Sequence, residues 1–139
     1  MASVRPAREP LEIAMDFIKR INAGNVDAIC ELMTDGHIFQ DALGERFIGR
    51  EKMRQGWRAY FKTIAQYQIR ADEFFQTDER LAIFGSASGI YAGNGAASPD
   101  NFWEVPAAWR VVIRDGLVAE WRVYADNQPL RKLMGERQP

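Results

Sequence analysis

The sequence predicts an α+β fold, because its helical and strand patterns occupy separate parts of the chain. Apolar residues recur at helical spacing in the first half, and four strand-like segments joined by short turns follow in the second half. The 139 residues are 47% hydrophobic and 27% charged, which is typical of one globular domain that needs no disulfide or metal to fold. We expect this domain to span residues 10–134, with a flexible segment at 1–9 and a loose tail at 135–139.

Three helices and one short strand are expected in the first half of the chain. The predicted helices span residues 9–23, 26–33 and 50–66. Pro10 suits the first turn of the first helix, and Asn25 is a good N-cap for the second. A short strand is expected at residues 37–43, followed by a loop that Gly44 and Gly49 bracket.

The second half predicts an antiparallel sheet. Its expected strands span residues 67–76, 81–91, 102–114 and 117–125. Asp115-Gly116 is the strongest hairpin signal in the chain and joins the last two of them. A final helical turn is expected at residues 129–134.

The composition argues against several classes of function. A net charge of -1 gives no basic excess for binding phosphates, so we expect no nucleic-acid partner. One cysteine, Cys30, and one histidine, His37, exclude a disulfide framework and any site built on several of these residues, so we expect no metal. No apolar run approaches the roughly 18 residues of a membrane span, and residues 1–9 lack the apolar core of a signal peptide. A cytoplasmic protein without membrane contact is therefore expected.

Three segments together resemble one known family. They are FIKRINAGNVDA at residues 17–28, FQDALG at 39–44 followed by GRE at 49–51, and WRVYAD at 121–126. Their order and spacing are similar to those of the nuclear transport factor 2-like superfamily, in its SnoaL-like branch of polyketide cyclase and ketosteroid isomerase relatives. The resemblance implies a cone, in which a strongly curved antiparallel sheet wraps three N-terminal helices and leaves a pocket. It also implies cofactor-independent chemistry in the enzymes of the family, alongside many non-catalytic binders.

Asp41 is the strongest candidate for a catalytic residue. It matches the position of the general base in ketosteroid isomerase, where a carboxylate moves a proton next to a carbonyl group. Such chemistry needs a carboxylate in a mostly apolar cavity, where desolvation favours proton uptake. The alternative is a turn-forming aspartate that bonds to the backbone of Leu43 or Gly44.

The other parts of the isomerase site are missing. Phe17 and Ala108 stand where the family has its oxyanion-hole tyrosine and protonated aspartic acid, and neither side chain can donate a hydrogen bond. Val123 stands where the epoxide hydrolases of the family have an aspartate. We therefore expect neither a true ketosteroid isomerase nor a complete epoxide-hydrolase site.

Strand alternation extends the predicted pocket. If Ala108 faces inward, Glu104 and Arg110 face inward with it. Arg110 is then expected either to pair with Asp41, Glu104 or Asp126, at the rim or inside, or to hold an anionic ligand. Glu104 is a candidate second carboxylate or a solvated rim residue.

Besides Arg110, two more side chains are candidates to assist Asp41 in catalysis. His37 lies four residues before it on the same face of the strand, although a lone histidine there is also typical of a surface or capping position. Tyr60 brings a hydroxyl from the third helix. The expected substrate-binding residues are Phe17, Trp57, Phe61, Phe84, Ser86, Ser88, Glu104, Ala108, Trp121 and Val123. For Phe61 the alternative is plain core, and for the two serines it is a need for small residues where the sheet bends.

Three functions compete at this point. The first is a cofactor-independent acid–base enzyme, an isomerase, cyclase, dehydratase or epoxide-hydrolase-like protein, acting on a small and mostly apolar molecule. The second is a non-catalytic binder of a hydrophobic metabolite. The third, a pure dimerisation module, is disfavoured because such modules usually accompany another domain. The substrate itself is not readable from the sequence.

A homodimer is also expected. Trp109, Val111 and Ile113, with Tyr124 on the next strand, are predicted to form an apolar stripe on the convex face of the sheet. The resemblance points to the same face, because family members often pair through it.

Overall fold

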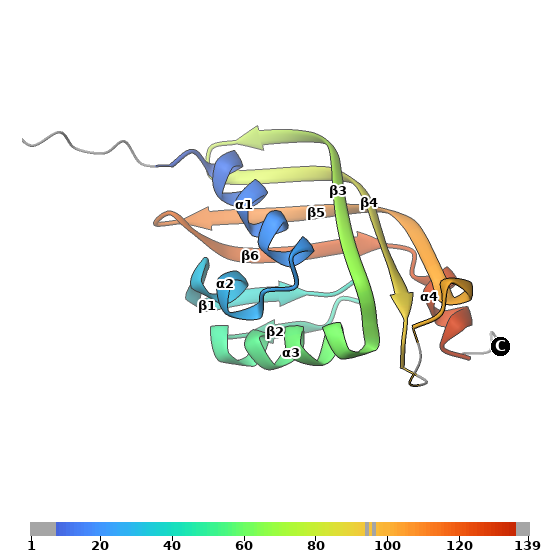
Figure 1. The fold of residues 1–139 in the computed structure, drawn as a ribbon. Coiled ribbons are helices and arrows are strands. Elements are labelled where there is room, and N and C mark those ends of the chain that lie inside the picture. Colours follow the sequence, from blue (N-terminus) through green and yellow to red (C-terminus); the bar gives the residue numbers. More distant parts are fainter. Residues whose placement is uncertain (1–7, 94, 96, 136–139) are drawn as a thin grey trace, which may run out of the picture.

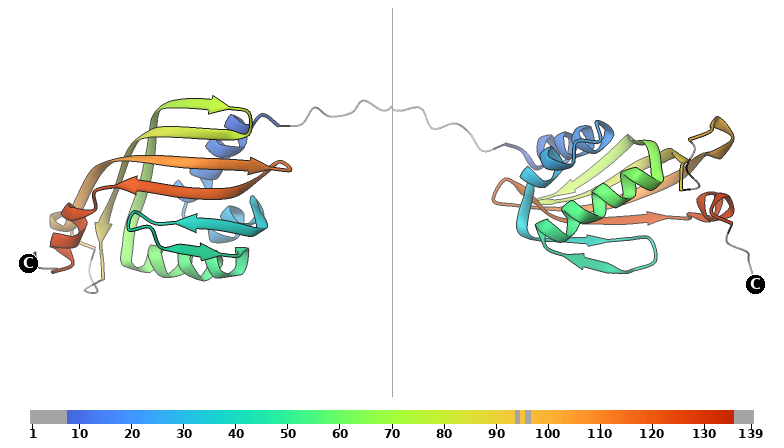
Figure 2. Two further views of the ribbon diagram at one scale, coloured as in Figure 1. Left: turned by 180° about the vertical axis from the view of Figure 1, so that it is seen from behind. Right: turned by 60° about the horizontal axis from the view of Figure 1, so that its bottom comes forward.

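In a computed structural model that describes residues 8–93, 95 and 97–135, a bent six-stranded sheet wraps around three helices (Figure 1). Figure 2 shows α1, α2 and α3 on one face of the sheet, with no helix of the described residues over the other. The elements are α1 (Pro10–Asn22), α2 (Val26–Glu31), β1 (Met33–Gln40), β2 (Arg46–Ile48), α3 (Arg50–Thr63), β3 (Ile64–Thr77), β4 (Arg80–Tyr91), a 3₁₀ turn (Pro99–Asn101), β5 (Phe102–Arg114), β6 (Leu117–Ala125) and α4 (Gln128–Leu133). The predicted α+β class is confirmed, while the expected loose segments lie mostly outside the described residues.

The sheet has the strand order β2-β1-β6-β5-β4-β3. Its neighbours are antiparallel, as predicted, except for the parallel pair β1 and β6. β1 comes from the helical half of the chain and is not joined to β6 by a hairpin, so the two strands are free to run in parallel. The predicted hairpin at Asp115-Gly116 is confirmed, and both residues have the positive φ that a tight two-residue turn of this kind needs.

Two bulges and two glycines produce the strong bend of β3 and β4 seen in Figure 1. The pairing of β3 with β4 shifts between Ala65 and Gln68 and again between Ala71 and Glu73. Beside these shifts, a Cβ at Gly85 would overlap the backbone of β3, and a Cβ at Gly89 would lie 3.1 Å from Trp103. The absence of a side chain at both positions therefore lets the strands cross closely and curve.

The boundaries in the first half differ from the expected ones. The third helix ends at Thr63 instead of residue 66, because Ile64 fits the helical pattern but is the buried first residue of β3. The second helix ends at Glu31, and β1 starts at Met33 rather than residue 37. The expected loop contains β2, whose three residues are too few to show a pattern; its Phe47 pairs with Phe39.

The alternation along β5 is opposite to the expected one. The inward side chains are Trp103, Val105, Ala107, Trp109, Val111 and Ile113, and the outward ones are Phe102, Glu104, Pro106, Ala108, Arg110 and Val112. Trp109 is only 1% exposed, and its ring lies 6.2 Å from that of Trp121. Trp109, Val111 and Ile113 of the expected dimer stripe are thus core, because the face with the larger apolar side chains removes more area from water when buried, whereas Tyr124 of that stripe is exposed on the outer face.

The inward and outward faces of β4 are also opposite to the expected ones. Leu81, Ile83 and Ala87 face inward, whereas Phe84 is 42% exposed on the outer face opposite Ala108. The prediction that Phe84, Ser86 and Ser88 face the pocket is therefore wrong, because β4 follows the register of its misassigned neighbour β5. Ser86 is nevertheless buried, on the outer face opposite Pro106.

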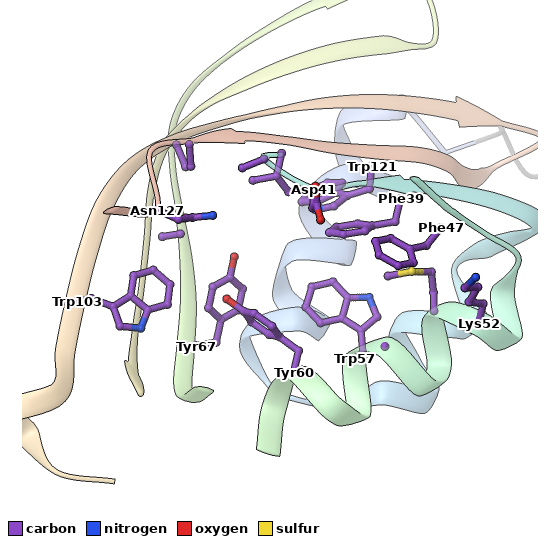
Figure 3. A pocket seen from close by; sticks show the side chains of 17 residues that line it. Phe39, Asp41, Phe47, Lys52, Trp57, Tyr60, Tyr67, Trp103, Trp121 and Asn127 are labelled. Carbon is purple, nitrogen blue, oxygen red and sulfur yellow. The ribbon is translucent and has the colours of Figure 1, made fainter. Parts of the chain in front are cut away.

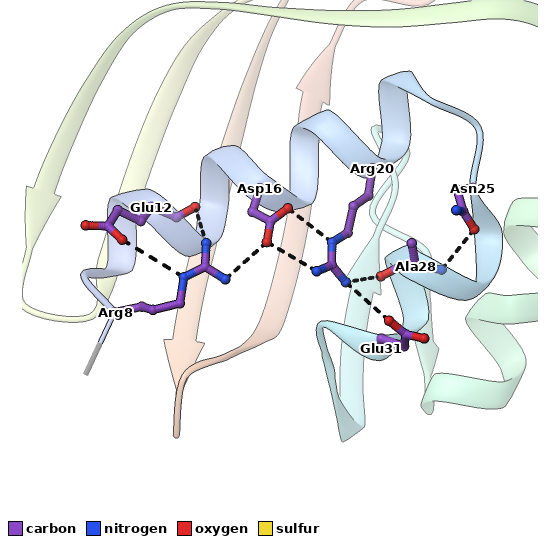
Figure 4. Close-up of polar contacts among 7 residues, drawn as sticks. All are labelled: Arg8, Glu12, Asp16, Arg20, Asn25, Ala28 and Glu31. Atoms are coloured by element: carbon purple, nitrogen blue, oxygen red, sulfur yellow. Dashed lines mark hydrogen bonds and ion pairs between the residues drawn. The ribbon is translucent and has the colours of Figure 1, made fainter. Parts of the chain in front are cut away.

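A polar network ties α1 to α2 on the side away from the sheet (Figure 4). Arg20 donates to the carboxylate of Asp16 at 3.1 Å and to the carbonyl oxygen of Ala28 at 2.6 Å. Arg8 reaches the same carboxylate at 3.1 Å, and the Asn25 side chain caps α2 by accepting from the Ala28 N–H, as predicted for an N-cap. These contacts fix the helices over one end of the sheet and leave the other end to α3.

Candidate functional site

A cavity of about 270 Å³ lies between α3, the β1–β2 hairpin and the concave face of the sheet (Figure 3). It is lined by Phe39, Asp41, Ala42, Phe47, Lys52, Met53, Gly56, Trp57, Tyr60, Tyr67, Ala87, Trp103, Ala107, Trp121, Val123, Ala125 and Asn127. The lining is mostly aromatic and aliphatic, with a few polar groups, as is typical of small-molecule sites. Its volume is just below the range of about 300–1,000 Å³ for drug-sized ligands, so the cavity suits a small molecule.

Asp41 follows β1 directly and lies half-buried at the wall of this cavity. One carboxylate oxygen, Oδ1, accepts from the backbone N–H groups of Leu43 at 2.9 Å and Glu45 at 3.0 Å. The other oxygen, Oδ2, has no hydrogen-bond partner among the described residues. The turn-forming interpretation is therefore confirmed for Oδ1, while the role of Asp41 as a general base stays a prediction. Figure 3 shows the carboxylate beside Phe39 and Trp121.

Two tyrosines line the part of the cavity that lies away from the start of α3. Tyr60 comes from the last turn of α3 and Tyr67 from β3, and their rings meet edge to face at 5.1 Å. Burial raises the pKa of Tyr67, and burial together with the neighbouring Tyr67 raises the pKa of Tyr60 well above its usual value. Both phenols therefore stay protonated at neutral pH and act as hydrogen-bond donors.

The other end of the cavity carries a positive charge. Lys52, an exposed residue of the first turn of α3, places its ammonium group 5.6 Å from the centre of the Phe47 ring. Gly56 lies one turn further along and is also exposed, which places the mouth of the cavity here. Lys52 and Tyr60 are eight residues apart on α3, about 12 Å along the helix axis.

His37 lies in the core and does not line this cavity. It is 0% exposed, and its ring lies 6.0 Å from that of Phe17. Nδ1 donates to the carbonyl oxygen of Val118 at 2.7 Å, so Nε2 is unprotonated and has no partner among the described residues. Burial lowers the pKa of His37, while the Val118 hydrogen bond and the charge of Glu120 offset this only in part. The structure does not bring His37 together with Asp41.

Arg110 and Glu104 lie on the outer face of the sheet and not in the cavity. Arg110 pairs with Glu120 at 2.8 Å, not with Asp41, Glu104 or Asp126. Its expected place in the pocket is wrong for the reason given for β5. Burial raises the pKa of Glu120, but the hydrogen bonds and charges of Arg110 and Arg122 outweigh this and hold the pKa below its usual value.

The expected substrate-binding residues divide into two groups. Trp57, Trp121 and Val123 line the cavity. Phe17 is fully buried core, and Phe61 packs against Trp57 at a ring distance of 5.4 Å outside the lining. The remainder, Phe84, Ser86, Ser88, Glu104 and Ala108, lie on the outer side of the sheet.

Several cavity residues were not expected from the sequence. Trp103 belongs to the misassigned face of β5, and Tyr67 lies where a bulge changes the alternation of β3. Phe47 and Lys52 come from segments that were expected to be a loop and the start of a helix. The signal that could have found Trp103 is its strict alternation with Val105 and Trp109, a larger apolar set than the opposite face carries.

Two general features complete the site. Within the described part of the chain, no group of three or more His, Cys, Asp and Glu side chains is arranged to hold a metal ion. Among the same residues, none of the helices combines the length and apolar character that a bilayer crossing requires.

The fold and the cavity together define a class of protein: a curved sheet wrapped around helices, with a small-molecule cavity inside. The model of the SnoaL-like domain family matches residues 14–121, and the chain belongs to this family. No curated protein sequence gives a match.

Solved structures show the same fold at low sequence identity. A candidate SnoaL-like polyketide cyclase from Jannaschia sp. CCS1 is 14% identical, with a TM-score of 0.79 over 99% of this chain and 100% of that one. A protein with a ketosteroid isomerase-like fold from Catenulispora acidiphila, solved with trimethylamine, is 17% identical, with a TM-score of 0.77 over 92% and 98%. IdmH, a candidate polyketide cyclase from Streptomyces antibioticus, is 16% identical, with a TM-score of 0.76 over 93% and 100%.

Proposed function

We propose that this protein is a cofactor-independent acid–base enzyme that acts on a small, mostly apolar, carbonyl-bearing molecule held in the cavity. The observation that carries the proposal is Asp41, which lines an aromatic cavity with one oxygen anchored by two backbone N–H groups and the other unpartnered among the described residues. Anchoring fixes the carboxylate, and the free Oδ2 is the group that can take a proton. The neighbours named as candidate polyketide cyclases support a substrate of this class.

The proposed step is a proton transfer at carbon. Asp41 Oδ2 removes a proton from the carbon next to the carbonyl group, and the electron pair of the C–H bond moves onto the carbonyl oxygen to give an enolate. With a β,γ-unsaturated ketone, the protonated Asp41 returns the proton to the γ-carbon, which isomerises the substrate. Alternatively, the enolate carbon attacks a second carbonyl group, which closes a ring, and Asp41 gives its proton to the alkoxide oxygen that forms. Neither outcome needs an electron acceptor or a cofactor. The apolar walls exclude water, which strengthens each electrostatic contact.

The test follows the proton and needs no knowledge of the product. Cyclic and aryl ketones are incubated with the protein in D2O, and exchange of the protons next to the carbonyl is followed by NMR. Asp41→Asn should slow this exchange by about 10²- to 10⁴-fold, because the amide keeps the shape and loses the base. Binding, measured by quenching of the cavity tryptophans, should stay within about twofold. Glu45→Gln, which removes an exposed carboxylate in the same loop, is the matched control.

The alternative is a non-catalytic binder of a hydrophobic metabolite. The mostly aromatic lining favours it, because such a lining binds an apolar body without any chemistry. Ketones that bind with no exchange above the Asp41→Asn background would show this function instead and end the general-base role.

We also propose that two copies of this chain pair through the outer face of the sheet. Phe84 and Tyr124, 42% and 51% exposed, flank Ala108 on adjacent strands, and Phe75 packs on Phe84 at 6.0 Å. This apolar patch, Phe75, Phe84, Ala108 and Tyr124, lies between two charged groups. One group is Arg70, Asp72 and Glu73, with an acidic excess; the other is Arg110, Glu120 and Arg122, with a basic excess.

A twofold axis that lies in the interface plane, at right angles to the line between the two charged groups, would bring the acidic group of one copy against the basic group of the other. Phe84→Glu should therefore convert a dimer into a monomer in sedimentation at micromolar concentration. Leu43→Glu, which alters an exposed apolar residue off the sheet, should leave the dimer intact. A wild-type monomer over this range would refute the pairing.

A further inference from the structure

The hydroxyl groups of Tyr60 and Tyr67 have no hydrogen-bond partner among the described residues. Their rings are packed by aromatic neighbours: Tyr60 against Trp57 at 6.0 Å, and Tyr67 against Trp103 at 6.2 Å. Figure 3 shows both hydroxyls directed into the same part of the cavity. Two hydrogen-bond donors that bond to no described residue thus lie side by side in a mostly apolar wall, where an acceptor oxygen of a ligand in the cavity can reach them.

A local distortion of β3 is what places Tyr67 there. Between the pairs Ala65–Ile90 and Gln68–Ser88, two residues of β3 oppose the single Gly89 of β4. The first of the two, Gln66, has φ of 52°, an uncommon conformation for a residue with a side chain.

This bulge changes which residues of β3 face inward. Ile64 is buried, so an unbroken alternation would send Gln66 inward and Tyr67 to the outer face. With the bulge, Tyr67 lines the cavity and Gln66 is exposed. Bulges often re-aim a side chain next to a functional site, and here the re-aimed group is a hydroxyl donor.

We propose that Tyr67 and Tyr60 form a donor pair that binds an acceptor oxygen of the ligand. The substrate class is then an aryl or cyclic ketone. Its carbonyl oxygen points toward the C-terminal end of α3. This inference rests on the proposed function, since it names how the same cavity holds its ligand. Two neutral donors match an oxygen with two lone pairs. Burial keeps both phenols protonated, so they offer hydrogens and no negative charge.

The pair also explains how this chain manages without the donors of the isomerases it resembles. Phe17 and Ala108 cannot donate, and the structure places both outside the cavity lining. An enolate that forms at the carbonyl oxygen carries more negative charge than the ketone, so fixed donors at that oxygen favour it. The two tyrosines supply such donors from α3 and β3 instead.

The test compares two probes of equal shape, 2-acetylnaphthalene and 2-ethylnaphthalene, of which only the first has an acceptor oxygen. Affinities are measured by quenching of Trp57, Trp103 and Trp121, which line the cavity. Tyr67→Phe should weaken ketone binding about 3- to 10-fold, the contribution of one neutral hydrogen bond, and the double variant with Tyr60→Phe should weaken it further. Binding of the hydrocarbon should stay within about twofold in both variants.

Tyr91→Phe, at the end of β4 and outside the cavity lining, is the matched control and should leave both affinities unchanged. The infrared stretch of the carbonyl, labelled with ¹³C, should lie at lower frequency in the wild-type complex than in the Tyr67→Phe complex, because a hydrogen bond weakens the C=O bond. Equal losses for both probes, or no loss for either, would overturn the donor pair while leaving cavity binding intact. A wild-type protein that binds neither probe would overturn the proposed cavity function and this inference with it.

Discussion

The concave face of the sheet has two halves that differ in how they are filled. Under α1, large side chains such as Ile13, Phe17 and Ile21 are 0% exposed, and a pocket of about 190 Å³ lies only beside the C-terminal end of the helix, where Ile21 and Ile64 border it. Under α3, only Met53 and Trp57 of the helix are buried, and about 270 Å³ stays open. One sheet thus supports a closed core and an open site side by side.

Polar groups follow the same division. In the closed half, His37 has its donor nitrogen bonded to Val118 at 2.7 Å, while its Nε2 and the Nε1 of Trp109 are sealed in the core without a partner among the described residues, where no ligand reaches them. In the open half, the hydroxyls of Tyr60 and Tyr67 and the Oδ2 oxygen of Asp41 have no partner within the described residues. The comparison teaches that residues of the closed half determine stability, whereas residues of the open half retain hydrogen-bonding capacity for a ligand.

The largest expected effect tests the closed half directly. Phe17→Ala should lower the free energy of unfolding by about 3–5 kcal/mol, since it removes a fully buried ring and leaves a cavity behind. Phe47→Ala, in the open half, should cost clearly less, about 1–2 kcal/mol, because its half-buried ring already borders open space. Urea unfolding measures both. Equal losses would show that the two halves do not differ in packing.

The second prediction uses the only histidine in the chain. Burial lowers the pKa of His37, so the fold binds a proton there less readily than the unfolded chain does. Its contribution to stability is complete above the unfolded pKa of about 6.5 and is lost as the pH falls through the lower folded pKa. Stability should fall in this window with a slope of at most about 1.4 kcal/mol per pH unit.

His37→Asn should flatten this slope, because the amide nitrogen keeps a donor for Val118 and does not titrate. Unfolding by urea at a series of pH values between about 5 and 7 measures it, a range where carboxylates change little. Asp16 and Glu120, whose pKa values are lowered by their arginine partners in spite of burial, add a further loss only at lower pH. An unchanged slope in the variant would contradict the role of His37.

The division between the two halves also explains what the sequence could predict. The helical face of α1 and the strands β5 and β6 were predicted with nearly correct bounds, because their patterns run uninterrupted for several turns or pairs. The inward face of β5 was not, because apolar residues occur on both faces, and alternation alone does not state which set is inside. Trp103 and Trp109 determine which face of β5 is inside, because their burial removes the larger apolar area from water.

The sequence predicted a cavity residue only where that residue lies in, or directly after, a helix or strand with regular alternation. Asp41, Trp57 and Tyr60 lie in the lining, as expected, although their roles in binding and catalysis stay predictions. Tyr67 was missed because the bulge at Gln66 shifts the alternation by one residue, and a single non-glycine residue with positive φ leaves no mark in the sequence. Such departures from regular structure cluster at functional sites.

The smallest expected effect is the sharpest test of the open half. Tyr67→Phe should leave the free energy of unfolding of the ligand-free protein within about 0.5 kcal/mol of the wild-type value, because its hydroxyl opens into the cavity and bonds to no described residue. For a domain of this size the melting temperature should move by no more than about 2 °C. Tyr91→Phe, at the end of β4 and outside the cavity lining, is the matched control. If Tyr67→Phe instead lowered stability, its hydroxyl would be bonded within the fold, and the open half would be closed at that point. Unchanged stability, together with the loss of ketone affinity, would show that this hydroxyl serves ligand binding and not the fold.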